Sequence, residues 1–164
     1  MMGIRRMILA VVTTAVASTP VSAACWSSRA VEAAYVRDFD TILMVATLRC
    51  RGQGMEITAD YNKFVREKRT LLVSANDELR AQFAAGRGAK AGLDAFDRFA
   101  TALANSHGAN AEGLSCAEYK ALAQAAASAP PDRAALLQLA ARAGASPDLP
   151  QEACSTTRQI ALAR

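Results

Sequence analysis

The sequence has little of what builds sheets, membrane spans or metal centres. Val, Ile and Thr are sparse after residue 73, and no segment alternates apolar and polar residues over the length of a strand. The longest apolar run falls well short of the roughly 20 residues that cross a bilayer. The four cysteines include no closely spaced pair of the kind that holds structural zinc, and the chain has one histidine. We therefore predict no sheet, no transmembrane segment in the mature chain, no metal site and no cofactor.

Motifs of known catalytic loops are also missing. No Gly-x-Ser-x-Gly segment occurs, which argues against a serine nucleophile elbow. Gly86-x-Gly88-x-x-x-Gly92 has a distant likeness to a dinucleotide-binding loop, but such a loop follows a strand, and a helical pattern precedes this one. The glycines at 86 and 88 favour a turn that ends a helix.

The first 23 residues have the order of a secretion signal. Arg5 and Arg6 precede the apolar stretch Met7–Ala17, and small residues end the segment at Ala23. We predict cleavage there and a periplasmic or secreted protein. Cys25 leaves lipoprotein anchoring open as an alternative, although Ser22 stands where a lipoprotein signal carries a large aliphatic residue.

The mature chain, residues 24–164, has the size of a single domain. Removing 23 of the 164 residues leaves 141, enough for one hydrophobic core. The leader takes away two of the 19 basic residues, so that 17 stand against 15 acidic ones and the net charge is +2. A charge this small argues against nucleic acid as a partner.

Apolar residues recur with the period of a helix along the mature chain. Ser27 or Ser28 can cap the first helix, and Ser115-Cys116-Ala117-Glu118 has the pattern of a capping box. The expected helices are Ser27–Cys50, Ile57–Ala85, Ala89–Ser106, Cys116–Ala127 and Pro131–Gly144, and a last helical stretch at Ala153–Leu162 is possible. The fold class is therefore all-α, a single disulfide-bonded helical bundle of about five helices.

Charged residues in these helices are expected to face water. Asp38 and Asp40 fall opposite the apolar stripe of the first helix. Lys68 interrupts the stripe of the second, where a solvated ammonium on a packed stem is favoured over a buried charge in a site. Asp94 is spaced to pair with Arg98.

The cysteine positions favour one of the three possible pairings. A continuous helix over residues 27–50 is about 36 Å long, which separates Cys25 from Cys50. If the first three helices run up, down and up, Cys50 and Cys116 meet at one pole, and Cys25 is left for Cys154. That pole would gather a candidate binding surface made of Arg49, Arg51, Gln53, Asn105, His107, Asn110 and Glu112.

These features favour a non-enzymatic binding or interaction module whose partner is a protein or small ligand of the cell envelope. The alternative is a small periplasmic hydrolase-type enzyme that uses Asp97, Asn105 or His107. A structural envelope component is a third possibility.

Several short strings together resemble a group of exported proteins. They are Leu48-Arg49-Cys50, Tyr61-Asn62-Lys63-Phe64, Phe96-Asp97-Arg98-Phe99 and Leu103-Ala104-Asn105, behind a leader that ends near Ala24-Cys25-Trp26. They resemble uncharacterised small exported helical proteins of Gram-negative bacteria, some of which carry the label S-adenosyl-L-homocysteine hydrolase. The residues here do not support that label, because such an enzyme is several times longer and holds NAD on a strand-based domain. The resemblance implies no site residues.

Overall fold

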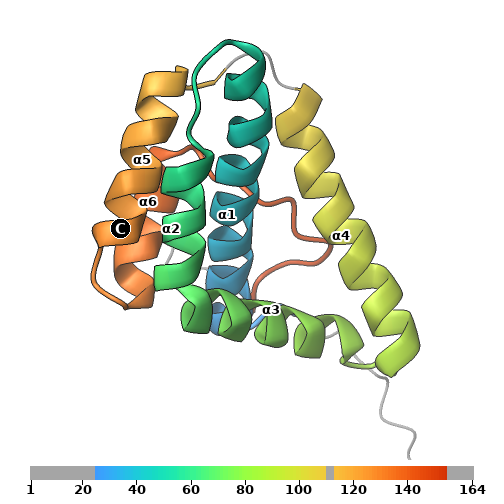
Figure 1. Cartoon of the computed structure of the whole chain (residues 1–164). Helices are drawn as coiled ribbons and strands as arrows, with labels where there is room; N and C mark the ends of the chain where they lie inside the picture. The colour runs from blue at the N-terminus through green and yellow to red at the C-terminus, as the bar shows by residue number, and fades with distance from the viewer. Residues whose placement is uncertain (1–24, 110–112, 155–164) are drawn as a thin grey trace, which may run out of the picture.

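The computed structural model describes residues 25–109 and 113–154, and these form six helices (Figure 1). They are α1 (Ser28–Gly52), α2 (Thr58–Glu67), α3 (Arg69–Ala84), α4 (Ala89–Ala109), α5 (Cys116–Ser128) and α6 (Arg133–Arg142). No strand occurs in this part of the chain, only one isolated bridge between Trp26 and Ala153. The expected leader lies outside the described residues, as does most of the expected helical stretch Ala153–Leu162. None of the helices in the described ranges is long and apolar enough to cross a membrane.

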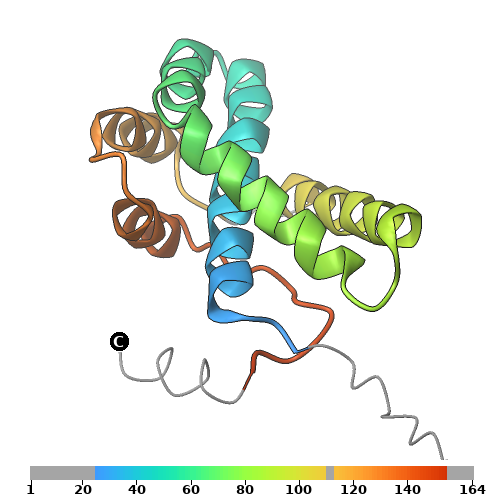
Figure 2. The same ribbon diagram turned by 90° about the horizontal axis from the view of Figure 1, so that it is seen from below.

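Helix α1 is the centre of the fold and contacts each of the other five helices. Its neighbours surround it in the view along the molecule from below (Figure 2). It is therefore buried on most of its circumference, and Asp38 and Asp40 lie inside the protein. The expectation that both face water was wrong, because α4, α2 and the C-terminal segment cover the sides of the helix on which they lie.

The predicted helix Ile57–Ala85 is two helices, and this is why there are six rather than about five. Lys68 leaves helical geometry at φ −106° and ψ 13°, and α3 runs across the foot of α1 (Figure 1). Helix α2 packs against α5, whereas α3 packs against α1 and α4. One straight helix could not bury both halves of this stripe, because the two halves face different neighbours.

Lys68 itself is buried, contrary to the prediction of a solvated ammonium. Only 5% of the residue is exposed. Its Nζ donates to the carbonyl oxygens of Ala127 at 3.2 Å and Ala129 at 2.5 Å. These carbonyls end α5, where backbone oxygens lack helical partners and attract a cation.

The glycines of the α3–α4 connection act as a turn, as predicted. Gly86 and Gly88 have φ of 71° and 82°, which side chains of L-residues rarely tolerate. Gly92 has another role inside α4, because a Cβ there would lie 2.5 Å from the Cα of Ala84. The close approach of α4 to the end of α3 depends on this missing side chain.

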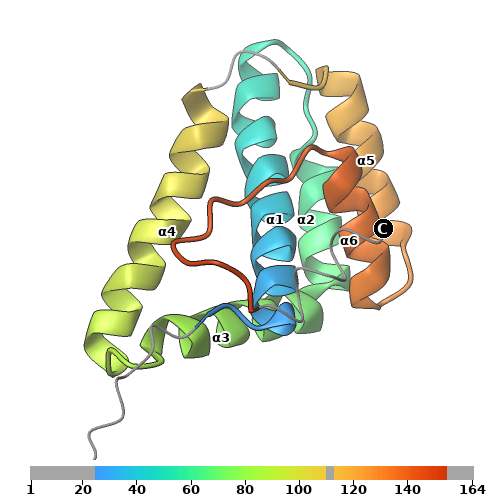
Figure 3. The ribbon, with the colours of Figure 1, turned by 180° about the vertical axis from the view of Figure 1, so that it is seen from behind.

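Two disulfides close the fold, and they join the pairs that the sequence favoured. Cys50 bonds Cys116, which fastens the end of α1 to the start of α5. Cys25 bonds Cys154, and Trp26 exchanges backbone hydrogen bonds with the segment around Ala153. The C-terminal segment therefore returns across α1 toward the N-terminal end of that helix, and it passes in front of α1 in Figure 3.

At the end of the bundle opposite the Cys50–Cys116 bond, Glu78 on α3 forms ion pairs with residues of α1 and α6. The guanidinium of Arg133 on α6 donates to both of its carboxylate oxygens at 2.8 Å, and Arg29 on α1 donates at 2.9 Å. These hydrogen bonds, those of Arg133 above all, lower the pKa of Glu78 to about 2.

Replacing Glu78 with Gln is expected to lower the free energy of unfolding by about 1 kcal/mol at pH 7. The folded state favours the ionised carboxylate, so its contribution is present above the ordinary pKa of 4.5 and is lost as the pH falls toward 2. Urea unfolding should therefore show a gap between wild type and Glu78→Gln that closes between pH 4.5 and pH 2. The exposed neighbour Asp77 provides the control Asp77→Asn, and an equal effect of both variants would contradict the assignment.

Candidate functional site

A concave site lies where α1, α4, α5 and α6 meet near the Cys50–Cys116 bond. The cavity has a volume of about 340 Å³. We call it the polar pocket; its lining residues are Ile42, Val45, Ala46, Arg49, His107, Gly113, Leu114, Tyr119, Arg142, Ala143 and Gly144. Apolar side chains of α1 form one wall, two arginines supply positive charge, and the only histidine of the chain also lines the cavity. No acidic side chain is among these lining residues.

Arg49 comes from the last turns of α1 and leans on α5. Its guanidinium carbon lies 5.0 Å from the centre of the Tyr119 ring, and its Nη2 donates to the carbonyl oxygen of Leu114 at 3.3 Å. Gly113 leaves room for this arrangement, since a Cβ there would lie 2.9 Å from the Tyr119 hydroxyl. The guanidinium is therefore held in place at the edge of the pocket.

His107 is held from behind by the buried Asp38. Its Nε2 lies 2.5 Å from Oδ1 of Asp38, and 1% of that aspartate side chain is exposed. The other carboxylate oxygen accepts from the backbone N–H of Ser146 at 2.8 Å. Since Nε2 is committed to Asp38 and no described residue hydrogen-bonds Nδ1 of His107, a ligand in the pocket would meet Nδ1.

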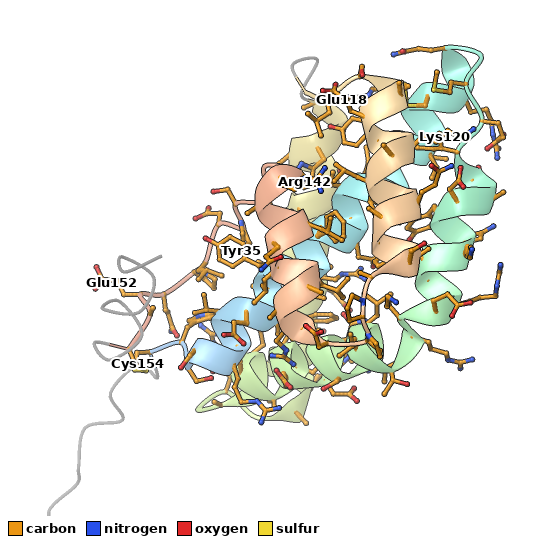
Figure 4. The ribbon with its side chains drawn as sticks, turned by 90° about the vertical axis from the view of Figure 1, so that its left-hand side faces the viewer. Tyr35, Glu118, Lys120, Arg142, Glu152 and Cys154 are labelled. Atoms are coloured by element: carbon orange, nitrogen blue, oxygen red, sulfur yellow. A yellow bond between two sulfur atoms is a disulfide. The ribbon has the colours of Figure 1, made fainter. Side chains whose placement is uncertain are left out.

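Arg142 completes the charge of the pocket from the last turn of α6, where Figure 4 shows it at the upper end of that helix. Unlike Arg49, it makes no hydrogen bond or ion pair with any other residue that the structure describes. Its guanidinium is therefore available to an anion. Its place in the pocket could not be predicted from the sequence, because only the packing of α6 beside α1 brings residue 142 close to residue 49.

The residues of the predicted binding surface divide into three groups. Arg49 and His107 line the pocket. Arg51 instead pairs with Glu56 at 3.2 Å, Gln53 lies exposed beside Cys116, and Asn105 is exposed on α4. Asn110 and Glu112 lie outside the described residues. The C-terminal ends of α1 and α4 thus supply one part of the surface, and the end of α6 supplies a part that was not expected.

The residues proposed for an enzyme do not converge. Asp97 is exposed on α4, ten residues and about 15 Å along the helix from His107. Asn105 also faces water. Only His107 has the partner of a potential general base, the carboxylate of Asp38.

Asp40 forms a second buried polar cluster with Tyr61 and Arg37, in which the Nε of Arg37 has no hydrogen-bond partner among the described residues. Tyr61 donates to Asp40 at 3.0 Å and Arg37 at 3.1 Å. Burial raises the pKa of Asp40, against the lowering effect of Arg37 and Tyr61. These residues line neither the polar pocket nor a second cavity beside α4 that is described below. We therefore assign the cluster to the packing of α2 on α1. Among the described residues no group of three side chains is arranged to hold a metal ion.

A comparison of the chain with protein-family models, with curated proteins and with solved structures finds no match. The function is therefore argued from the geometry of the pocket.

Proposed function

We propose that this protein is an exported, non-enzymatic binding protein that holds a small anionic ligand in the polar pocket. The observation that carries the proposal is the convergence of Arg49, His107 and Arg142 on one cavity with no acidic side chain among its lining residues. Export rests on the leader Met1–Ala23, and the two disulfides are of the kind that persists in an oxidising compartment.

The shape and chemistry of the pocket narrow the class of ligand. Its volume of about 340 Å³ is at the low end for small-molecule sites. Guanidinium groups bind carboxylate or phosphate oxygens with paired N–H donors. The apolar wall of Ile42, Val45 and Ala46 suits a short carbon skeleton. A small dicarboxylate fits these requirements best, and phosphate offers the same anionic oxygens without the skeleton.

A second candidate function rests on the contact between His107 and Asp38. A buried carboxylate that orients an imidazole is the arrangement of a general base, which could activate a water molecule against an ester. Turnover of p-nitrophenyl acetate that His107→Asn abolishes would favour this enzyme. We rank it second because the other two residues suggested for an enzyme, Asp97 and Asn105, are exposed and do not line the pocket.

The binding proposal is tested on protein recovered from the periplasm, whose intact mass should place the N-terminus at Ala24 or Cys25. Its only histidine gives isolated imidazole signals in NMR spectra. Titration with succinate is expected to shift the His107 signals to saturation, whereas the neutral analogue succinamide should leave them in place. Arg142→Ala should weaken succinate binding about tenfold, because it removes a charge-assisted hydrogen bond.

Arg51 supplies the matched control. It lies at the same end of α1 but pairs with Glu56 and does not line the pocket, so Arg51→Ala should bind succinate like wild type. Equal losses in Arg51→Ala and Arg142→Ala would reduce the effect to general surface charge. Absence of any saturable shift with either succinate or phosphate would reject the anion pocket.

A further inference from the structure

A second cavity, distinct from the polar pocket, lies between α4 and the returning C-terminal segment. Its volume is about 580 Å³, which is well within the range of sites for small molecules. Phe83, Phe99 and Leu103 form its floor, and Pro150 of the C-terminal segment lines the opposite side. Figure 3 shows this C-terminal segment crossing in front of α1 toward α4. We call the cavity the apolar groove.

One face of α4 shapes the groove. Ala95, Arg98, Phe99, Ala102, Leu103 and Ser106 follow one another in alternating steps of three and one, so they share a side of the helix. The alanines keep the groove open, since larger side chains at 95 and 102 would fill it. The C-terminal segment on the opposite side is held at both ends. The backbone N–H of Ser146 donates a hydrogen bond to Asp38, and Cys154 forms a disulfide with Cys25.

The charge around the groove is mainly positive. Arg87 and Arg98 line it, and Asp148 is the only acidic residue among the described lining residues. The expected pair of Asp94 with Arg98 does not form, because Asp94 instead accepts from Lys90 at 3.1 Å. Neither Arg87 nor Arg98 makes an ion pair or hydrogen bond with another described residue.

We propose that the apolar groove binds an amphiphilic anion, a carboxylate on an unbranched alkyl chain. The alkyl chain would cover Phe83, Phe99 and Leu103, and the carboxylate would meet Arg87 and Arg98. Charge complementarity selects this occupant over a cationic amphiphile and over the basic end of the chain itself, which carries Arg158 and Arg164.

The only tryptophan is placed to report on the groove. The ring of Trp26 lies 5.3 Å from that of Phe83 and 6.2 Å from that of Phe99, measured between centroids, and both phenylalanines line the floor. Filling the groove should therefore alter the fluorescence of Trp26, whereas an anion in the polar pocket should act on the signals of His107. The two proposals can thus fail independently.

The test is a fluorescence titration of the oxidised protein with decanoate below the concentration at which it forms micelles. A saturable change is expected with decanoate, and weaker binding with decanol and decyltrimethylammonium. Arg87→Ala combined with Arg98→Ala should weaken decanoate binding about fivefold and leave decanol unaffected, because exposed ion pairs are modest. Arg66→Ala, at an exposed arginine of α2, should behave like wild type.

Ala102→Phe separates the groove from general surface effects. Residue 102 is exposed on α4, so the larger side chain can fill the groove without displacing the core, and it should abolish binding of decanoate and decanol alike. Equal affinity for decanoate and decanol in the wild type would overturn the proposal. So would full decanoate binding by the double arginine variant or by Ala102→Phe.

Discussion

Replacing Cys50 and Cys116 together with alanine is expected to lower the free energy of unfolding by about 4 kcal/mol. The bond joins residues 66 positions apart, and its loss releases a long loop in the unfolded chain. Cys50 is also completely buried, so the smaller side chains leave unfilled space where α1 meets α5. Urea unfolding followed by circular dichroism without reductant measures the difference.

The same variant should lose the polar pocket before it loses its helices. Arg49 is one residue from Cys50, and Tyr119 is three residues from Cys116, so the bond holds the two halves of that wall together. The succinate-induced shift of His107 should disappear under conditions where the variant is still folded. Removing Cys25 and Cys154 instead releases the termini and should leave that shift in place. A variant without Cys50 and Cys116 that binds succinate like wild type would show that packing alone forms the pocket.

Local signals in the sequence were enough to locate most helix ends. Ser27 caps α1 and accepts from the backbone N–H of Ala30 at 3.2 Å. Ser115 and Glu118 form the capping box that begins α5. Such signals involve residues within one turn of each other, so they do not depend on how the helices pack.

The burial of charges could not be predicted in the same way. Asp38 was expected on the outer face because it falls opposite the apolar stripe of the first predicted helix. Its burial depends on His107 and Ser146, which lie 69 and 108 positions away in the sequence. A pattern within one helix does not show which neighbours cover it, and α1 is covered on most sides.

Only the part of the candidate site that lies beside a disulfide could be predicted from the sequence. Arg49 and His107 were expected together because a bond between Cys50 and Cys116 brings the ends of α1 and α4 to one pole. Arg142 was not expected there, since no cysteine or short loop ties the end of α6 to that pole. Its position follows from the packing of α6 along α1, which no local pattern encodes.

Replacing Lys68 with methionine is expected to lower the free energy of unfolding by about 2–3 kcal/mol, although methionine keeps most of the apolar stem. Among the described residues, Lys68 is the only side chain that donates hydrogen bonds to the carbonyl oxygens of Ala127 and Ala129, and the variant removes this donor. Buried acceptors without a donor retain their full desolvation cost, which amounts to about 1–3 kcal/mol for such a loss. The end of α5 should then fray, and its last amides should exchange hydrogen faster.

Lys63 allows a matched control for this variant. It lies on α2 one helical turn and one residue before Lys68, and it is exposed, so Lys63→Met makes the same chemical change in water. Surface substitutions of this kind change stability by less than about 0.5 kcal/mol. If Lys68→Met unfolds at the same urea concentration as Lys63→Met, the hydrogen bonds of the buried ammonium do no more than offset the free energy lost when it leaves water.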